Sequence, residues 1–189
     1  MKPYMDVFNL CSTILDIGCG GGFTTNYLRK KSNNFFKKST VYGIDISSVV
    51  IKKAQKKYPK CIFKVAQGDK IPFDDHMFDF AIINSVTVHI PRRFTRGYIK
   101  ELGRVLKPGS HCLIQLVSFP KLDGIEEDPI FTPAFGPEPH IGWPIEKIFE
   151  IIKESNLDIE IIRRRYMKRD NIDALGEIKD YWLLLKKPK

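Results

Sequence analysis

The residues whose types and spacing suggest chemistry begin with a glycine-rich loop. Residues 16–22 read Asp-Ile-Gly-Cys-Gly-Gly-Gly and follow a short apolar run. Glycines in this setting let the backbone turn sharply and approach a ligand closely. The spacing does not fit a dinucleotide fingerprint, because Phe23 and Thr25 stand where its third glycine would be, and the Gly-Lys-Ser/Thr ending of a P-loop is absent. The carboxylate of Asp16 at this strand tip suits a ligand that carries an amine, and not a pyrophosphate.

Three more polar side chains follow later apolar segments. Asp45 ends the second segment, 23 residues after Gly22, where a carboxylate can accept hydrogen bonds from both hydroxyls of a ribose. Asp69 follows the third segment, where it is placed to meet the edge of an adenine, and Asn84 stands at the tip of the fourth. These spacings indicate a ligand that contains a nucleoside.

Short apolar runs alternate with helical patterns over residues 13–117, which predicts an α/β fold with a parallel sheet covered by helices on both faces. In such a sheet ligands bind at the carboxyl ends of the strands, at the switch point next to the first strand. The expected strands are 13–17, 40–46, 61–66, 78–83 and 111–117. The expected helices are 23–31, a helix capped by Ser47 or Ser48 that runs to 58, and 91–106, which is ended by Lys107-Pro108-Gly109.

The pattern changes in residues 118–143. This stretch contains five prolines and four large aromatic residues, which favours a long loop on the substrate side over regular secondary structure. The remaining expected elements are a helix over 144–156 and an antiparallel pair of strands, 157–162 and 181–186. No linker is evident, so residues 1–189 are expected to form a single domain.

The composition is that of an ordinary globular protein. The chain has 189 residues, of which 43% are hydrophobic and 28% charged, and this excludes disordered, collagen-like and small secreted classes. Its four cysteines form no Cys-x-x-Cys pair and are expected to be reduced, buried thiols of a cytoplasmic protein. No apolar run approaches 18 residues and the amino end does not resemble a signal peptide, so neither a membrane span nor a membrane partner is expected.

The chain is basic, with 31 Lys and Arg residues against 22 Asp and Glu residues and a net charge of +9. A basic surface can serve nucleic acid or an anionic membrane. The basic residues also punctuate nearly every expected helix and edge, which favours a solvated lysine-rich surface as the interpretation. The run Arg163-Arg164-Arg165 supports the alternative of an anion-binding face.

The order of these motifs resembles the class I, Rossmann-like, S-adenosylmethionine-dependent methyltransferase family, in its type 11-like small-molecule branch. The matching stretches are 14–22, 42–45, 68–69, 78–79 and 104–109. They lie within residues 13–117, more than half of the chain. The resemblance implies a three-layer α/β sandwich whose mostly parallel seven-stranded sheet has the order 3-2-1-4-5-7-6, with strand 7 antiparallel.

The resemblance also assigns parts of the cofactor S-adenosylmethionine to residues. It places the methionine part over the glycines with Asp16 facing its ammonium, the ribose on Asp45, and the adenine amine on Asp69. Asn84 lies near the methionine end. The full set of expected cofactor-binding residues is Asp16, Gly18, Gly20, Gly22, Asp45, Ile46, Asp69, Lys70, Ile71 and Asn84.

Catalytic residues are expected to be few, because the sulfonium is already a strong methyl donor and the protein mainly aligns the nucleophile and excludes water. His89, just after the fourth strand, is the candidate general base or acceptor contact, and the alternative is a histidine that packs or caps a helix start. Phe135, His140 and Trp143 are candidates for lining the acceptor pocket. Residues 118–120 lack the carboxylates that hold magnesium in catechol-type members, so no metal is expected.

Three functions stay open. The favoured one is an enzyme that methylates an O, N or S atom of a small-molecule acceptor. The second is an RNA or protein methyltransferase that uses the basic surface, so nucleic acid is a less favoured partner. The third is a cofactor-binding regulatory protein without catalysis. About 12 residues precede the first strand, so either the 118–143 loop covers the site alone or the chain is a shortened form.

Overall fold

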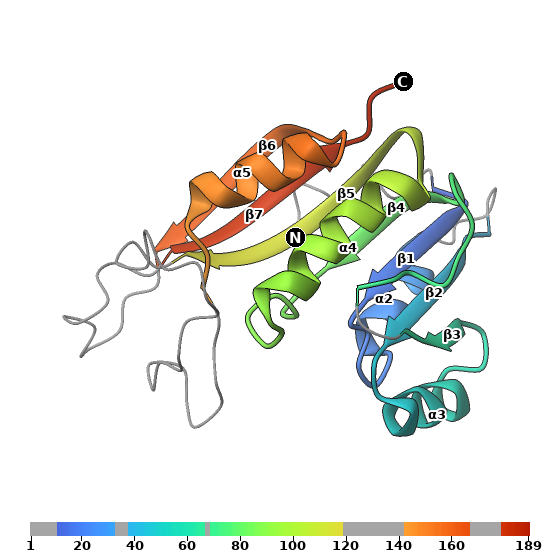
Figure 1. Cartoon of the computed structure of the whole chain (residues 1–189). Coiled ribbons are helices and arrows are strands. Elements are labelled where there is room, and N and C mark those ends of the chain that lie inside the picture. The colour runs from blue at the N-terminus through green and yellow to red at the C-terminus, as the bar shows by residue number, and fades with distance from the viewer. Residues whose placement is uncertain (1–10, 33–37, 67–68, 119–141, 167–178) are drawn as a thin grey trace.

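The structure is a computed structural model that describes residues 11–32, 38–66, 69–118, 142–166 and 179–189 (Figure 1). Its centre is a seven-stranded sheet in the order β3-β2-β1-β4-β5-β7-β6. The first five strands pair in parallel, and β7 pairs antiparallel with both β5 and β6. The strand order and the antiparallel strand 7 confirm the prediction from the sequence.

The elements keep the predicted order along the chain. The strands are β1 (Thr13–Ile17), β2 (Thr40–Asp45), β3 (Ile62–Val65), β4 (Phe78–Ile83), β5 (Leu106–Ser118), β6 (Asp158–Tyr166) and β7 (Lys179–Lys186). The helices are α2 (Phe23–Ser32), α3 (Ser48–Lys57), α4 (Arg92–Val105) and α5 (Ile145–Glu154). Ser47 caps α3 as predicted, because its hydroxyl oxygen accepts a hydrogen bond from the Val50 N–H at 3.3 Å.

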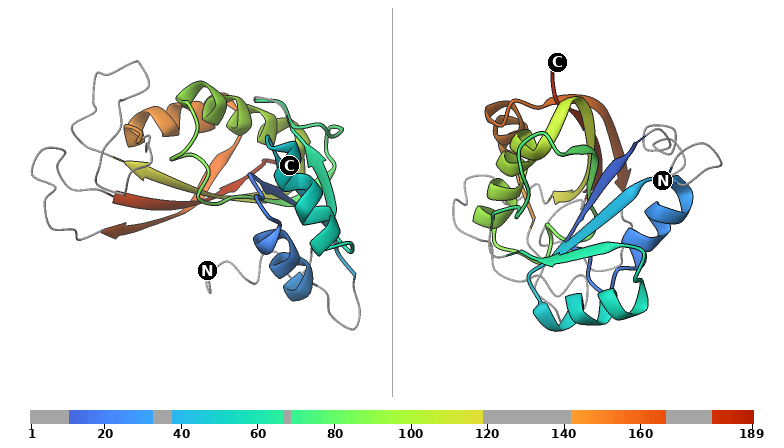
Figure 2. Two further views of the ribbon diagram at one scale, coloured as in Figure 1. Left: turned by 90° about the horizontal axis from the view of Figure 1, so that it is seen from below. Right: turned by 90° about the vertical axis from the view of Figure 1, so that its right-hand side faces the viewer.

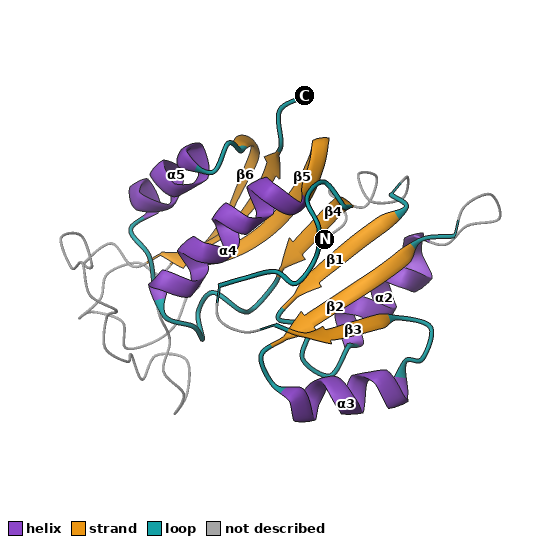
Figure 3. Ribbon diagram, turned by 45° about the vertical axis from the view of Figure 1, so that its right-hand side comes forward, coloured by secondary structure: helices purple, strands orange, loops and turns teal. Residues whose placement is uncertain are grey.

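The helices form layers on the two sides of the sheet (Figure 2). Helices α4 and α5 lie side by side on one face, α2 lies on the other, and α3 lies at the β2–β3 end (Figure 3). The larger core lies under α4 and α5 and includes Ile99 and Leu102, whereas Leu28 and Phe80 belong to a smaller core on the α2 face. Because both faces are covered, the central strands β1 and β4 are apolar along most of their length.

Strand β5 begins earlier than predicted. It starts at Leu106, directly after α4, and not at His111. Helix α4 ends before Lys107-Pro108-Gly109 as predicted, but this stretch already belongs to the strand, because the Gly109 N–H donates to the Lys187 carbonyl at 2.9 Å and Gly109 takes a φ of 78° that only glycine adopts easily. Pairing with the carboxyl end of the chain therefore overrides the local turn signal.

The last two strands are also longer than predicted. Strand β6 runs through the arginine run, so Arg163 and Arg164, as neighbours in a strand, point to opposite faces of the sheet. These two arginines therefore do not share one face of the sheet. All four cysteines are buried and none forms a disulfide, which confirms that expectation. In the described part of the chain, no helix is both long enough and apolar enough to cross a membrane.

Candidate functional site

A cavity of about 300 Å³ lies where β1, β2 and β4 end. Parallel strands bring their carboxyl ends to one edge of the sheet, so residues far apart in the sequence meet there. The cavity is lined by Gly18, Asp45, Ile46, Ser85, Val86, His89, Ile90, Phe94 and Tyr98. Four of these, Gly18, Asp45, Ile46 and His89, are residues that the sequence had marked as functional.

The glycine loop forms the first wall of the cavity. Gly18, Gly20 and Gly22 have φ values of 69°, 50° and 79°, in the region that disfavours residues with a Cβ. A Cβ on Gly18 would also collide with the Val86 side chain, and one on Gly22 would lie 2.7 Å from Phe63 Cζ. The loop is tied to the sheet by the Cys19 N–H, which donates to the Ile44 carbonyl at 2.9 Å.

Asp45 joins the end of β2 to the glycine loop. One carboxylate oxygen accepts a hydrogen bond from the Gly20 N–H at 2.9 Å, and the other accepts one from the Ser47 N–H at 2.9 Å. A carboxylate offers about four acceptor positions, so two remain for other donors. Since Asp45 also lines the cavity, it can receive both hydroxyls of a ribose while it stays fixed by the backbone.

Asp16 lies beneath the loop with only 2% of its surface exposed. Its Oδ2 accepts a hydrogen bond from the Thr25 hydroxyl at 2.7 Å. Burial raises the pKa of Asp16 to about 7, partly offset by the hydrogen bonds from Thr25. The carboxyl group can therefore be protonated or ionised near neutral pH, and an ammonium group placed close to it would favour the ionised form.

Helix α4 forms the second wall, and the sequence analysis did not identify it. Phe94 and Tyr98, together with Ile90 just before the helix, lie four residues apart and therefore face the cavity together. Burial raises the pKa of Tyr98, and the negative charges of Asp45 and Asp69 add to this effect. The four-residue spacing was a readable signal, but a sequence pattern alone does not separate a helix face that lines a cavity from one that fills a core.

Helix α4 also approaches the segment that carries Asp69. A Cβ on Gly97 would collide with the Asp69 side chain, so the helix backbone comes close only because residue 97 is glycine. The Ile71 N–H donates to Glu101 at 3.0 Å, and Arg104 donates to the Ile71 carbonyl at 2.9 Å. These bonds hold the Asp69 segment against α4.

The remaining predicted cofactor residues differ in their access to the cavity. Asp69 and Lys70 are exposed, whereas the Ile71 side chain is 3% exposed and packs in the larger core. Asn84 is half-buried, and its side-chain oxygen accepts a long hydrogen bond of 3.4 Å from the Ser85 hydroxyl. Neither Ile71 nor Asn84 lines the cavity.

His89 is exposed at the mouth of the cavity. Its backbone N–H donates to the Val86 carbonyl at 2.9 Å, which closes a turn between β4 and α4. This turn places residue 89 at the edge of the cavity. His89 therefore faces the same space as Asp45 and Gly18.

The structure places Trp143 away from the cavity lining. Its side chain is 4% exposed and belongs to the larger core, with the Arg92 guanidinium 5.3 Å from the centre of its ring. Arg92 donates to the Gly142 carbonyl at 2.8 Å, which fixes this end of the segment to the start of α4. The other two predicted pocket residues, Phe135 and His140, lie outside the described residues.

Two further observations concern ions. Within the ranges that the structure describes, no group of three or more His, Cys, Asp or Glu side chains is arranged to hold a metal ion. Asp79 accepts hydrogen bonds from the Ser12 and Thr13 N–H groups and forms an ion pair with Lys107 at 2.8 Å. It links β1 to β4 and β5 at the end of the sheet opposite the cavity.

The strand order, the glycine loop after β1 and the acidic residues at the ends of β1 and β2 define the class I, Rossmann-like methyltransferase architecture. The model of the methyltransferase domain family matches residues 15–114, more than half of the chain. The chain therefore belongs to this family. Membership confirms S-adenosylmethionine as the cofactor that the sequence predicted.

Similar proteins support the assignment. The chain is 29% identical over 161 residues to the ubiquinone/menaquinone biosynthesis C-methyltransferase UbiE of Rickettsia prowazekii, a match that covers 80% of this chain and 63% of the relative. A SAM-dependent methyltransferase from Methanosarcina mazei has a TM-score of 0.73 at 23% identity over 93% of this chain and 92% of that chain. The [4+2]-cyclase SpnF has a TM-score of 0.75 at 16% identity over 98% of this chain and 80% of that chain.

These likenesses differ in what they show. The two solved structures share less than 25% of their residues with this chain, so they show the fold alone. The chain spans less than two thirds of the length of the curated relatives matched first.

The residues of the first wall fit the cofactor. The glycines of the loop have left-handed backbone conformations and no side chains, so a ligand can approach the backbone closely. Asp45 keeps two acceptor positions for the hydroxyls of a ribose. Asp16 offers a carboxylate for an ammonium group close to the loop. When bound, S-adenosylmethionine would supply an electrophilic methyl group.

Proposed function

We propose that this chain transfers a methyl group from S-adenosylmethionine to a small, largely apolar acceptor that binds against the α4 wall. The observation that carries the proposal is the contrast within one cavity: Gly18 and Asp45 form a polar wall, while Phe94 and Tyr98 form an apolar, aromatic one. A cofactor with an amine and a ribose suits the first wall. An aromatic or aliphatic acceptor suits the second.

The names of curated relatives support an apolar acceptor. They include a demethylmenaquinone methyltransferase from Staphylococcus carnosus, a probable tocopherol O-methyltransferase from rice and a sterol 24-C-methyltransferase from Gibberella zeae. Several of these acceptors are lipid-like and carry a ring. Carbon therefore joins oxygen, nitrogen and sulfur among the atoms that this chain is proposed to methylate.

His89 is proposed as the general base. The bound cofactor would supply the methyl group, and a hydroxylated acceptor that received it would release the proton of its hydroxyl. An imidazole at the cavity mouth can take this proton and pass it to water. Phe94 and Tyr98 exclude water from the reacting atoms and hold the acceptor in line.

The alternative of an RNA or protein substrate is less well supported. It relied on the net charge of +9 and on the arginine run, in which Arg163 and Arg164 point to opposite faces of β6. The cavity walls also offer aromatic and aliphatic side chains, and no Arg or Lys side chain is among the residues that line this cavity.

The test is an activity assay that measures S-adenosylhomocysteine. The protein is incubated with S-adenosylmethionine and a panel of demethylated quinols, phenols and short RNA. We expect product with at least one quinol or phenol, and a His89→Ala variant should lower the turnover by about 10²- to 10⁴-fold. The matched variant His89→Gln keeps the size and polarity of the side chain without a base.

Three outcomes would contradict the proposal. Product from RNA alone would favour the second function. Cofactor binding without product from any acceptor would favour a protein that binds the cofactor without methyl transfer. An unchanged turnover in His89→Ala would remove the proposed base while leaving the methyl transfer itself in place.

A further inference from the structure

The net positive charge of the chain is concentrated in one region. Residues 17–68 contain eleven Lys and Arg residues and a single acidic residue, Asp45, so they carry +10 while the whole chain carries +9. The remaining residues therefore carry a net charge close to zero. A charge distribution this uneven creates a local field that a uniformly mixed surface would not have.

Part of this charge lies in a stripe along the outer face of α3. Val49, Lys52, Lys53 and Lys56 are spaced i, i+3, i+4 and i+7, which places them on one face of the helix. All four side chains are exposed, and Val49 is 61% exposed. The stripe therefore begins with an aliphatic residue near the cavity and continues with lysines away from it.

The apolar end of this stripe belongs to a larger cluster at the cavity mouth. Ile46, just before α3, lines the cavity and is 66% exposed, and Phe23, the first residue of α2, is 75% exposed. Helices α2 and α3 both follow strands that end at this edge, so their first residues lie beside the mouth. Three large apolar side chains are therefore exposed on the same edge.

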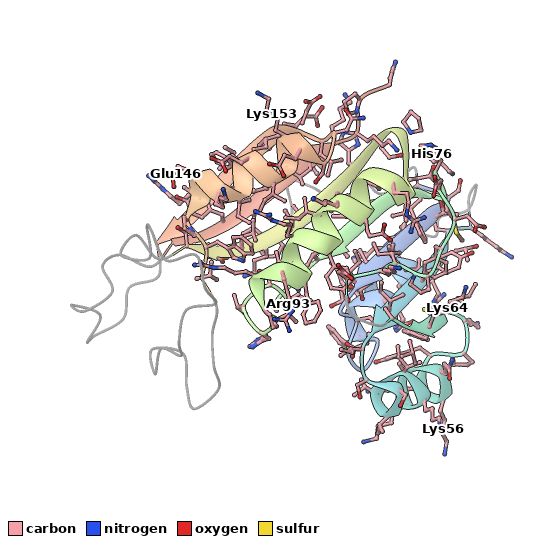
Figure 4. All side chains as sticks on the ribbon, in the orientation of Figure 1. Lys56, Lys64, His76, Arg93, Glu146 and Lys153 are labelled. Atoms are coloured by element: carbon pink, nitrogen blue, oxygen red, sulfur yellow. The ribbon has the colours of Figure 1, made fainter. Side chains whose placement is uncertain are left out.

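Basic residues also lie on the other side of the mouth. Arg93 and Arg96 near the start of α4 are exposed, and residues 80–100 contain no acidic residue. In Figure 4, Arg93 lies at the lower end of α4 and Lys56 lies on α3 at the bottom of the view. The exposed acidic residue at this edge is Asp69, which the bound cofactor is expected to engage.

We propose that this edge, made of Phe23, Ile46, Val49, Lys52, Lys53, Lys56, Arg93 and Arg96, docks the chain on an anionic lipid surface. The aliphatic and aromatic side chains gain free energy when they enter the interface, and the lysines and arginines lie at the level of the negative headgroups. Docking in this orientation turns the cavity mouth towards the lipid. The inference extends the proposed function, because an apolar acceptor could then enter from the lipid without crossing water.

The chemistry of the edge favours lipid over nucleic acid. Ile46 and Val49 are aliphatic and can neither stack on a base nor accept its hydrogen bonds, whereas they can insert among acyl chains. The basic side chains on α3 are all lysines, which act as point charges and do not provide the bidentate contacts that arginine makes to phosphate or guanine.

The test is cosedimentation with vesicles of phosphatidylcholine, with or without phosphatidylglycerol, in the absence of any acceptor. We expect binding to the anionic vesicles that weakens as salt is added, and little binding to phosphatidylcholine alone. The triple variant Lys52→Gln, Lys53→Gln, Lys56→Gln should bind roughly 100-fold more weakly, since each lysine near a membrane surface contributes about fivefold.

A charge-matched control removes three lysines elsewhere. Lys147, Lys153 and Lys189 are exposed, the first two on α5 and the third at the carboxyl end, so their replacement by Gln changes the net charge equally. This control should bind like the original protein. A second variant, Phe23→Ser with Val49→Ser, should lose the part of the binding that persists at high salt.

Several results would overturn the inference. These are no binding to anionic vesicles, equal losses in the two triple variants, or tighter binding of a mixed-sequence RNA that the Phe23→Ser, Val49→Ser variant leaves unchanged. The affinity for S-adenosylhomocysteine, measured without lipid, should stay the same in both triple variants because none of these lysines lines the cavity. If the original protein binds S-adenosylhomocysteine but does not bind anionic vesicles, the docking is refuted and the proposed enzyme is not.

Discussion

The two walls of the cavity are built differently. On the glycine-loop wall, backbone groups set the geometry: the Gly20 and Ser47 N–H groups hold Asp45, and the Cys19 N–H holds the loop to β2. On the α4 wall, the side chains of Phe94 and Tyr98 set it. The glycine-loop wall, proposed to bind the cofactor, depends on backbone conformations that few residues can adopt. The α4 wall, proposed to bind the acceptor, depends on side chains that can change without disturbing the fold.

Among the variants of the glycine-loop wall, Gly18→Ala is expected to weaken cofactor binding most. The left-handed conformation costs alanine about 1–2 kcal/mol, and the new Cβ would also displace Val86. We expect the affinity for S-adenosylhomocysteine, measured by calorimetry, to fall by at least about 100-fold.

Gly21→Ala is the matched control for this variant. A Cβ on Gly21 meets no atom within 4 Å, and its φ is not positive. Its affinity should stay within about twofold of the original. Equal affinities for the two alanine variants would show that the loop conformation does not form the cofactor wall.

The second prediction concerns the carboxylate that joins the loop to β2. Asp45→Ala should weaken cofactor binding by about tenfold to a few hundredfold, because hydrogen bonds to a charged group contribute about 1.5–3 kcal/mol each. The substitution also leaves the Gly20 and Ser47 N–H groups without their acceptors.

Asp45→Asn tests the charge separately from the shape. It should retain more affinity than the alanine variant, because an amide oxygen still accepts one hydrogen bond. Calorimetry of both variants gives the comparison. An unchanged affinity in Asp45→Ala would place the ribose elsewhere.

The third prediction uses the protonation of Asp16. With a pKa of about 7 in the cofactor-free protein, against an ordinary value of 3.8, the carboxyl group is ionised in only a small fraction of molecules at pH 5. A ligand ammonium requires the ionised form, so the affinity for S-adenosylhomocysteine should rise by about tenfold per pH unit between pH 5 and 7 and then level off. Asp16→Asn should bind weakly and show no such rise.

The raised pKa of Asp16 also makes the stability of the fold depend on pH. Stability falls as the pH rises, whereas the affinity for the ligand increases. Because the folded pKa lies above the unfolded one, the contribution of the protonated acid is fully present below pH 3.8 and is lost as the pH rises to about 7. In urea unfolding, Asp16→Asn should therefore gain stability relative to the original protein as the pH rises over this range. A difference that does not change with pH would contradict the raised pKa.

The smallest expected effect concerns the contact between α4 and the Asp69 segment. Arg104 donates to the carbonyls of Ile71 and Phe73 and forms ion pairs with Asp75 and Glu101. Arg104→Ala should lower the free energy of unfolding by about 1–3 kcal/mol and weaken cofactor binding only a few-fold. Denaturant unfolding and calorimetry measure the two effects.

Arg104→Lys separates the contribution of the positive charge from that of the planar guanidinium group. It keeps the positive charge and loses the planar donor group that reaches two carbonyls at once. We expect a stability between the original and the alanine variant. If both variants lose cofactor affinity by more than about 100-fold, then α4 belongs to the cofactor wall and the contrast between the walls fails.

The prediction from sequence was most complete where the backbone carries the information. The glycine loop, Asp45 and the parallel strands were identified from local patterns, because glycine clusters and short apolar runs are visible in a sequence. The strand order followed from the resemblance to the methyltransferase family. The prediction placed the start of β5 at His111 and not at Leu106, because the bond between the Gly109 N–H and the Lys187 carbonyl belongs to a segment distant in the sequence. It also missed Phe94 and Tyr98, whose apolar spacing is the same in a core and in a cavity wall.

By itself the sequence determined the class of fold, the place of the cofactor loop and the uneven distribution of charge, since these depend on residue types at fixed spacing. Only the tertiary structure decided which side chains share the cavity. It brought Gly97 against Asp69, buried Trp143 in the core and placed the apolar start of α3 at the cavity mouth. Such contacts join segments distant along the chain, and their positions follow from how helices pack on the sheet, which no local pattern records.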